Sequence, residues 1–599
     1  MGCHDALLQR VRGLLAVGQE SQAEAALRRA ASSHTADRPL YQAIGELLLT
    51  SGRFLQAEFY IRRALSLKPS NPEDTEALAK ALMGQQKFDA AHKLLSDLIS
   101  ANPQHTNARI ILATSLRRQK KTASSLAVLK EALKPGVNDA ALLNAYAHAL
   151  HAAGRVEEAV PILRRVIAAA GDQAPALDGY CSVLNYCPGI TRHELLDAHA
   201  RFGRAIEHTP APRPPGAGAL RLPGRPLRVG LLSSDLRDHV IPMFIAPFIE
   251  HADRKRTRLT CFNTSPVEDA VSARLREKSD AWHWLPLAPP AKVADCIRKE
   301  SIDILIELNG HTRGHKLDAL ALRPAPVQIT YLGYPATTGM KSIDFRIVDS
   351  TTDPHGSEDF CTERLLRIDP CFLCYRPPAS LPPINTRPDQ PVTFVSFTNL
   401  AKLSSPLIAL WAGVLQAVPG SRLLMKHYSL LEQEVRADLA ARFAAHSIPA
   451  DRLDLRPPIE DRADHLAAYH DADICLDTAP YNGTTTIFES LLMGVPVITL
   501  SGKFHAGRVT QSLLANVGLD DLVAPNEEAY IAKAAALAAD APRRAELRAT
   551  LRERLLNSPL CDEPAFARRL TDALYRAWDT IGSLPPTPAP PSPRSIVYA

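Results

Sequence analysis

The 599-residue chain has no run of about 18 apolar residues, the length that a membrane-spanning helix needs. Its first residues, MGCHDALLQRVRGLL, lack the apolar core of a secretory signal, and Ala6 stands where a myristoylation signal has Ser or Thr. The 10 cysteines are scattered and form no disulfide framework, which favours a reducing compartment. These absences predict a cytoplasmic protein without membrane attachment.

An excess of one charge is also missing. The 69 Lys+Arg against 64 Asp+Glu leave a formal net charge of +5. So small an excess on so long a chain does not favour nucleic acid or an acidic membrane as the partner. The 46% of hydrophobic and 22% of charged residues are ordinary for a globular protein. At this length, three or four domains are expected.

Motifs for redox cofactors, P-loops and metals are absent. There is no GxGxxG fingerprint and no GxxxxGK[ST] loop, which argues against dehydrogenases and P-loop ATPases. Cys371 and Cys374 form a lone CxxC, which we expect to be a structural pair on a strand. Asp471 and Asp473 precede a strand at its remote end, where we expect solvated charges. No His/Cys cluster has metal-ligand spacing, so the sequence predicts no metal site.

The first third of the chain repeats with a period of 34 residues. Gly18, Gly52 and Gly154 lie on this grid, with Gln86 and Lys120 at the two points between them. A small residue follows each grid point by five positions: Ala23, Ala57, Ala91, Ser125 and Ala159. The pattern resembles the tetratricopeptide repeat (TPR) and predicts an α-helical solenoid over residues 1–176. A generic helical solenoid is the alternative. Either array presents a concave surface to proteins or peptides.

Two blocks in which strands alternate with helices follow the repeats. Residues 177–226 contain an amphipathic helix and a Pro/Gly-rich connector; the blocks occupy residues 227–385 and 386–580. The predicted strands lie in LRVGLLSSD, RLTCFNTS, IDILIEL, VQITYLG and FRIVD, and then in VTFVSFT, SRLLMKH, ADICLD and VPVITL. The alternation predicts two α/β Rossmann-like domains whose strand ends face one cleft. Residues 581–599 are Pro-rich, and we expect them to be disordered.

The most informative motif is DICLDTAPYNGTTTIFESLLMGVPVITL. The loop after its first strand contains Asn482, Gly483, Thr484, Thr485 and Thr486. Small residues at a helix start expose backbone N–H groups and the positive end of the helix dipole to an anion. We therefore predict a nucleotide diphosphate here; a plain threonine N-cap is the alternative. Glu489 lies one helical turn further on the same face, placed to accept a ribose hydroxyl.

Two other strand ends contain polar side chains that we expect to face the same cleft. Asn399 and Lys402 follow the first strand of the second block, where a lysine can neutralise a diphosphate leaving group. Asp235 and His239 follow the first strand of the first block. A histidine there accepts a proton or orients a substrate hydroxyl, and capping of a helix is the alternative role.

Four further residues are weaker cleft candidates. His311 and Thr312 form another strand-end turn, and Tyr334 lies in the Gly/Thr-rich loop LGYPATTG. His199 lies in the helix that precedes the Pro/Gly-rich connector.

Together these residues resemble the O-GlcNAc transferase/SPINDLY family of protein O-glycosyltransferases. The motifs SSDLRDH, GHT…LRPAPVQITYLGYPATTG, FTNLAK and NGTTTIFESLLMGVPVITL carry the resemblance, which spans nearly the whole chain. It implies a GT-B catalytic region and an inverting, metal-independent transfer of a sugar from a nucleotide sugar to Ser or Thr. The acceptor proteins would be held by the repeat groove, no cofactor is implied, and the oligomeric state stays open.

The resemblance also implies roles for individual residues. Lys402 stabilises the leaving diphosphate, Asn399 lies beside the donor, and Thr485 and Thr486 contact its phosphates. His465 matches a histidine near the nucleotide base, whereas Glu489 stands where O-GlcNAc transferases have an Asp on the ribose. His239 and Asp235 match residues at the acceptor end.

The chain departs from O-GlcNAc transferases at three positions of these motifs. Thr484 replaces a His, His311 replaces a Tyr, and Asn399 replaces a Gln. These letters look more like the SPINDLY branch, which is associated with GDP-fucose, so UDP-GlcNAc and GDP-fucose are both candidate donors. A repeat scaffold with a silent transferase half is the alternative from another class; the intact Lys402 and threonine loop argue against it.

Overall fold

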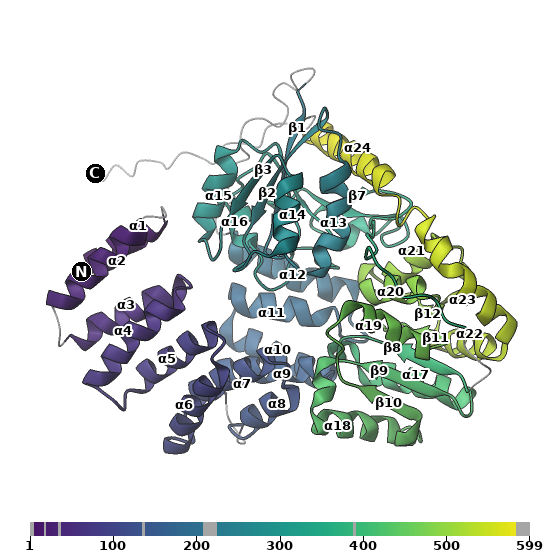
Figure 1. The fold of residues 1–599 in the computed structure, drawn as a ribbon, viewed down its shortest axis with the longest axis horizontal. Helices are drawn as coiled ribbons and strands as arrows, with labels where there is room; N and C mark the ends of the chain where they lie inside the picture. Colours follow the sequence, from purple (N-terminus) through teal and green to yellow (C-terminus); the bar gives the residue numbers. More distant parts are fainter. Residues whose placement is uncertain are drawn as a thin grey trace, which may run out of the picture. The chain divides into compact units, whose positions relative to one another are not determined.

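The computed structural model describes residues 5–16, 20–33, 37–133, 138–207, 225–386 and 391–582 (Figure 1). The chain divides into two compact units, Met1–Ala153 and Gly154–Ala599. The predicted connector beyond residue 207 and the predicted tail beyond residue 582 lie outside the described residues. Within the described part of the chain, no helix combines the length and the apolarity needed to cross a bilayer.

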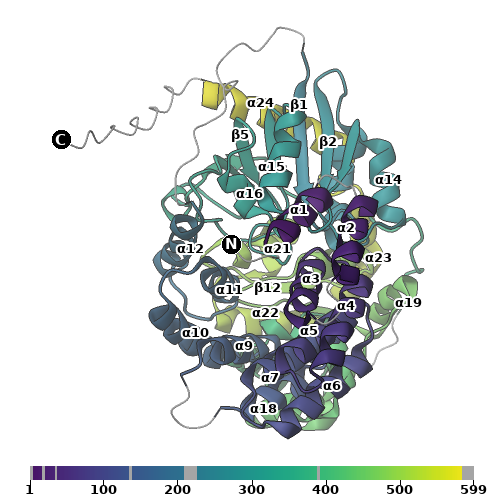
Figure 2. The same cartoon turned by 90° about the vertical axis from the view of Figure 1, so that its left-hand side faces the viewer.

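The first unit is a row of helices in which each packs on its neighbour along the chain, and this confirms the predicted helical repeats (Figure 2). The helices are α1 (Asp5–Ala16), α2 (Glu20–Ser33), α3 (Arg38–Thr50), α4 (Phe54–Leu67), α5 (Pro72–Gly84), α6 (Phe88–Ala101), α7 (Thr106–Arg118), α8 (Thr122–Lys130) and α9 (Ala140–Ala152). The small residues Ala23, Ala57, Ala91 and Ser125 are buried between them, as the repeat pattern requires.

The 34-residue period of the sequence is also a period in the backbone, because the same conformation recurs at every 34th residue. Gly52, Gln86, Lys120 and Gly154 all have positive φ, from 62° to 73°. Each lies just after the first helix of a pair, where a left-handed residue ends the helix and reverses the chain. Glycine adopts this conformation without strain, but Gln86 and Lys120 adopt it as well. The turn therefore requires the conformation, and glycine is only the commonest residue that supplies it.

The second unit begins with three more helices, α10 (Val156–Ala170), α11 (Ala174–Leu184) and α12 (Arg192–Ile206). Helices α10 and α11 continue the repeat pattern but pack as part of the second unit. α12 is the predicted amphipathic helix, and it starts with a capping box of Thr191 and Glu194. Its apolar face includes the buried side chains of Leu195 and Phe202.

Two parallel sheets follow, and both have the Rossmann strand order. The first sheet has the order β3-β2-β1-β4-β5-β6-β7 and the second β10-β9-β8-β11-β12-β13. In both, the order reverses between the first strand of the block and the fourth, which makes a crevice at the carboxyl ends of β1 and β4 and of β8 and β11. The fold class predicted from the sequence is therefore confirmed.

The strands and helices of the first sheet alternate along the chain. They are β1 (Leu227–Ser233), α13 (Val240–His251), β2 (Thr257–Asn263), α14 (Ala270–Lys278), β3 (Ala281–Trp284), α15 (Pro290–Lys299), β4 (Ile304–Glu307), α16 (Leu317–Ala321), β5 (Val327–Thr330), β6 (Phe345–Val348) and β7 (Arg364–Arg367).

The second sheet is built in the same way. Its elements are β8 (Thr393–Ser396), the short turn η2 (Leu400–Lys402), α17 (Ser405–Ala417), β9 (Arg422–Lys426), η3 (Tyr428–Leu431), α18 (Gln433–Ala444), β10 (Leu453–Arg456), α19 (Arg462–Ala467), β11 (Ile474–Leu476), α20 (Thr485–Leu492), β12 (Val497–Leu500), α21 (Val509–Ala515), β13 (Val523–Ala524), α22 (Glu527–Ala539) and α23 (Ala541–Leu556).

The C-terminal helix α24 (Glu563–Gly582) returns to the first sheet, although it follows the second in sequence (Figure 1). It packs against α13, β5 and β7, and the Tyr575 hydroxyl donates to the carbonyl of Arg256 at 2.8 Å. One continuous hydrophobic core includes strands of both sheets. The two domains are thus joined by the return of the chain through α24 to the first domain and by a shared core.

Cys371 and Cys374 lie in an irregular buried segment after β7, so the predicted strand there is wrong. Both are free thiols. Burial raises the pKa values of both thiols, which keeps them protonated. They act as small apolar side chains of the core.

Candidate active site

A cleft of about 690 Å³ opens at the carboxyl ends of the strands of both sheets. The predicted site residues that line it are Asp235, His239, Thr312, Asn399, Lys402, Thr484, Thr485 and Thr486. They come from the loops after β1, β4, β8 and β11, which are the four switch-point strands. The structure thus brings together, in one cavity, groups that are distributed over both blocks of the sequence.

The start of α20 forms one part of the wall that the second sheet contributes. Thr484 precedes the helix, and its carbonyl accepts from Ile487 and Phe488 at 3.0 and 3.1 Å. Its side chain makes no capping hydrogen bond, so the helix lacks the plain threonine N-cap that was the alternative. Among the described residues, none accepts a hydrogen bond from the N–H groups of Thr485 or Thr486. This helix terminus therefore presents donors and a positive dipole end to the cleft.

Asp477, at the end of β11, fixes the loop before α20. Its carboxylate accepts from the Gly483 N–H at 2.7 Å, the Thr478 N–H at 2.8 Å and the Thr499 hydroxyl at 2.8 Å. Burial raises the pKa of this carboxyl. Asn482 donates to the carbonyl of Thr478 at 2.9 Å. Asn482 and Gly483 do not line the cleft; they shape the loop that presents the threonines.

Lys402 lies beside this loop, at the end of the turn η2 that Asn399 caps. The Asn399 side chain accepts from the Ala401 N–H at 3.1 Å. The Lys402 ammonium donates to the carbonyl of Asn482 at 2.6 Å and lies 4.2 Å from the centre of the Tyr481 ring. Burial lowers the pKa of Lys402 to about 8. A positive charge therefore stands next to the open terminus of α20 at neutral pH.

Asp235 and His239 lie on the opposite wall, which the first sheet contributes. The Asp235 carboxylate accepts from the Asn309 amide at 2.8 Å and lies 3.6 Å from the guanidinium of Arg237. His239 caps α13, because its Nδ1 accepts from the Ile241 N–H at 3.4 Å. His239 therefore caps a helix, which was the alternative role, and it also lines the cleft; its role toward a substrate stays a prediction.

The helix cap defines what His239 can do chemically. Burial lowers its pKa, so the ring is neutral at physiological pH. With Nδ1 accepting a hydrogen bond, the proton of the neutral ring lies on Nε2. Nε2 is therefore a hydrogen-bond donor. In this state the ring orients an oxygen atom, whereas uptake of a proton would require the other tautomer.

His465 and Glu489 contact each other but are not part of the cleft lining. His465 Nε2 lies 3.0 Å from the Glu489 carboxylate, and its Nδ1 lies 2.9 Å from the ammonium of Lys426. Lys426 in turn lies 4.2 Å from the ring centre of Phe397, which does line the cleft. Burial lowers the pKa of Lys426 to about 8. This charged cluster borders the cleft through Phe397.

His199, His311 and Tyr334 do not line the cleft, in contrast to Thr312. His199 is fully buried, and its Nε2 lies 2.7 Å from the Tyr334 hydroxyl. Burial lowers the pKa of His199 to about 3. His311 bonds to the carboxylate of Asp178 in α11 at 2.7 Å. These side chains join α11 and α12 to the first sheet. The two helices cover strand ends that we expected, from the sequence, to face the cleft.

Several cleft residues were not identified from the sequence. They are Tyr186, Arg237, Phe397, Tyr481 and His505. Lys426 lies beside the cleft and is the last residue of β9. Its position at the carboxyl end of a strand is the signal that identified Lys402, so the sequence could have indicated Lys426 as well. Tyr186 had no such signal, because it lies between α11 and α12 and reaches the cleft only through the packing of those helices.

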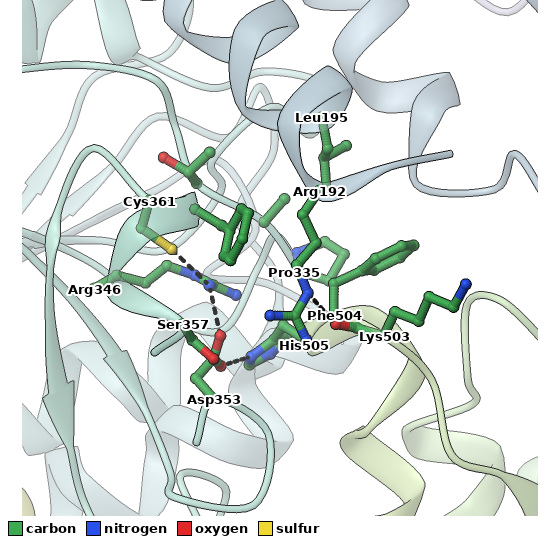
Figure 3. A pocket seen from close by; sticks show the side chains of 13 residues that line it. Arg192, Leu195, Pro335, Arg346, Asp353, Ser357, Cys361, Lys503, Phe504 and His505 are labelled. Atoms are coloured by element: carbon green, nitrogen blue, oxygen red, sulfur yellow. Dashed lines mark hydrogen bonds and ion pairs between the residues drawn. The ribbon is translucent and has the colours of Figure 1, made fainter. Parts of the chain in front are cut away.

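A smaller pocket adjoins the cleft and shares His505 with it (Figure 3). His505 Nδ1 lies 2.5 Å from the Asp353 carboxylate, which also lies 3.6 Å from the Arg346 guanidinium. These groups link the loop after β12 to the segment between β6 and β7. Within the described residues, no cluster of three His, Cys, Asp or Glu side chains is arranged to hold a metal ion.

Two Rossmann sheets that face a common cleft, and that follow TPR helices in the sequence, define a GT-B catalytic region with an N-terminal TPR array. The chain belongs to glycosyl transferase family 41, whose model matches residues 214–375 and 384–570. Further family models match residues 51–132, as anaphase-promoting complex, cyclosome, subunit 3, and residues 112–175, as a tetratricopeptide repeat.

Known proteins similar to this chain include plant and bacterial ones. The probable UDP-N-acetylglucosamine–peptide N-acetylglucosaminyltransferase SPINDLY of Arabidopsis thaliana is 38% identical over 66% of this chain and 44% of its own length. The Arabidopsis relative named SEC is 29% identical over 59% of this chain and 37% of its own. A mutant O-GlcNAc transferase of Thermobaculum terrenum is 31% identical, with a TM-score of 0.79 over 85% of this chain and 97% of that one. The chain thus spans less than half the length of these curated relatives.

Proposed function

We propose that this chain is an inverting protein O-glycosyltransferase that transfers GlcNAc from UDP-GlcNAc to Ser or Thr hydroxyls of proteins. The relatives SPINDLY and SEC support this donor, since both are named as probable UDP-N-acetylglucosamine–peptide N-acetylglucosaminyltransferases. The TPR helices support a protein acceptor, because a helical array offers a long surface for a polypeptide. An O-fucosyltransferase that uses GDP-fucose is not favoured by these names.

The observation that carries the proposal is the pairing of Lys402 with the open terminus of α20. The donor diphosphate would lie against the N–H groups of Thr485 and Thr486, at the positive end of the helix dipole. As the bond between the sugar C1 and the phosphate oxygen breaks, negative charge grows on that oxygen. The Lys402 ammonium would neutralise it. In this proposal lysine and helix supply the charge stabilisation, so no metal ion or other cofactor is needed.

The acceptor hydroxyl would approach from the wall of the first sheet. The hydroxyl oxygen attacks C1 from the side opposite to the diphosphate and forms the new glycosidic bond as the bond from C1 to the phosphate oxygen breaks. The attack inverts the configuration of C1, and the hydroxyl proton leaves to water. His239 Nε2–H would donate to an oxygen of the sugar or the acceptor, and the Asp235 carboxylate on the same wall would accept a hydrogen bond from a hydroxyl there. The cluster of Glu489, His465 and Lys426 would hold the nucleoside at the border of the cleft.

The test is a labelling experiment with the purified full chain and a cell lysate. UDP-GlcNAc and GDP-fucose are offered in separate reactions, and modified peptides are identified by mass. We expect an N-acetylhexosamine increment on Ser or Thr with UDP-GlcNAc alone. A deoxyhexose increment with GDP-fucose would contradict the proposed donor. No increment together with no nucleotide binding would contradict the transferase and leave a repeat scaffold.

A further inference from the structure

One side chain of the cleft belongs to neither sheet. Tyr186 lies between α11 and α12, at the end of the helical array, yet it lines the cleft together with Lys402. Its ring centre lies 4.9 Å from that of Tyr481, with the planes tilted by 53°. The Tyr481 ring also contacts the Lys402 ammonium, which lies 4.2 Å from its centre. The three side chains form a continuous row from the helical array to the lysine.

Residues at the start of α10 make a second set of contacts with the turn that contains Lys402. The carbonyls of Gly154 and Leu403 accept from one guanidinium nitrogen of Arg442, at 3.1 and 2.6 Å. Gly154 packs so closely that a Cβ there would lie 2.5 Å from the carbonyl oxygen of Leu400. The carboxylate of Glu157, in α10, accepts from the Ser405 N–H at 2.7 Å. The start of α10 and the loop after α11 thus fix the segment around η2 at two separate points.

We propose that Tyr186 is a positioning residue for Lys402, so that the end of the helical array forms part of the leaving-group site; this rests on the function proposed above. Tyr186 fixes the Tyr481 ring by tilted aromatic packing, and the fixed ring holds the ammonium by a cation–π contact and excludes water from it. Without the Tyr186 ring, Tyr481 can rotate, and water reaches the ammonium.

The surroundings of Lys402 make this role measurable. The Asp477 carboxylate is the charge that acts on the ammonium, and it favours the protonated form. Burial raises the pKa of Tyr186 to about 12 and also raises that of Tyr481, so both rings are neutral. The charged or titratable groups that line the remainder of the cleft are Asp235, Arg237, His239, Arg313 and His505. Removal of the Tyr186 ring opens the space beside Tyr481 to water, and the better hydration of the ammonium raises the pKa of Lys402.

The experiment measures binding of UDP and of GDP to the full chain by calorimetry between pH 6.5 and 10. We expect Tyr186→Ala to weaken binding about tenfold at neutral pH and to move the alkaline loss of affinity to higher pH. Tyr186→Phe, which keeps the ring, restores both properties. Tyr186→Leu, which keeps most of the buried volume, retains the fold and shows the shift in pH dependence if Tyr186→Ala proves unstable.

The matched control is Tyr180→Ala in the same segment. Tyr180 lies in α11, its hydroxyl accepts from Arg164 at 3.3 Å, and it does not line the cleft. This variant should lose stability but keep the wild-type pH dependence of nucleotide binding. If the Ala and Leu variants of Tyr186 bind with wild-type affinity and pH dependence, the positioning role is wrong. If the wild-type chain binds neither nucleotide, the proposed function itself fails.

Discussion

The two walls of the cleft differ in whether their polar groups already have hydrogen-bond partners within the protein. On the wall of the second sheet, the N–H groups at the start of α20 have no acceptor among the described residues, and Lys402 stands beside them. On the wall of the first sheet, Asp235 accepts from Asn309 and His239 caps α13. The second wall is therefore built to receive an outside anion. On the first wall the charges of Asp235 and Arg237 lie 3.6 Å apart and offset each other, which suits this wall to orienting a neutral hydroxyl.

The largest effect is expected from removing the cation of the second wall. Lys402→Ala should lower the rate of transfer by about 10²–10³, since one group that stabilises developing oxyanion charge contributes this much in comparable sites. Steady-state transfer to an acceptor peptide measures the loss. Lys299→Ala, at an exposed position of α15, is the control and should leave the rate unchanged. A Lys402→Ala enzyme with nearly full rate would refute the leaving-group role.

A substitution on the first wall should separate catalysis from nucleotide binding. His239→Asn keeps an N-cap acceptor but removes the ring nitrogen that faces the cleft. Transfer should fall about tenfold to a hundredfold, because a hydrogen bond that positions a reacting oxygen is lost, while UDP affinity stays the same. His427→Asn is the matched control, because His427 caps η3 and does not line the cleft. Parallel losses of transfer and of UDP affinity in His239→Asn would contradict the division between the walls.

A smaller effect is expected from displacing the threonine loop. In Gly483→Ala, the new Cβ would lie 2.8 Å from Ile487 Cγ1 and 2.9 Å from the Thr486 hydroxyl. The loop must shift by a few tenths of an ångström, and we expect about a threefold to tenfold loss of UDP affinity. Calorimetry measures it. The control Gly13→Ala introduces a Cβ with no atom within 4 Å; unchanged affinity in both variants would show that the loop does not contact the diphosphate.

The smallest effect is a pH dependence that belongs to the second wall alone. Burial lowers the pKa values of Lys402 and Lys426 to about 8, so both are charged below this pH and lose their protons above it. UDP affinity should therefore decline above about pH 8, well below the ordinary titration of lysine. Lys426→Arg, whose charge persists, should leave the part of the decline that Lys402 causes. Affinity that stays constant up to pH 10 would show that neither ammonium contributes to UDP binding.

The sequence was sufficient to predict the central strands and their switch points, but not the sheet edges. Central strands such as β1 and β4 are buried on both faces and consist of continuous apolar residues, which is a strong local signal. The edge strands β3 and β10 are short and half-exposed, and their mixed composition resembles that of loops. Both were missed, as were β7 and β13.

The same reasoning explains which site residues could be found. Lys402 and Asp235 were identified because a polar residue after a central parallel strand faces the crevice unless another element covers it. His311 and Tyr334 also follow central strands, but α11 and α12 cover them. Tyr186 enters the cleft through the same helix packing. Contacts between elements this distant in the sequence leave no local pattern, so they required the three-dimensional structure.

The most direct test of the account is the affinity of the full chain for UDP, compared between one variant from each wall. We expect Lys402→Ala to lose most of the affinity and His239→Asn to keep it, although both lose transfer. That result would establish that one wall binds the leaving nucleotide and the other serves the acceptor. Equal affinities in the two variants, whether both lost or both retained, would contradict the account.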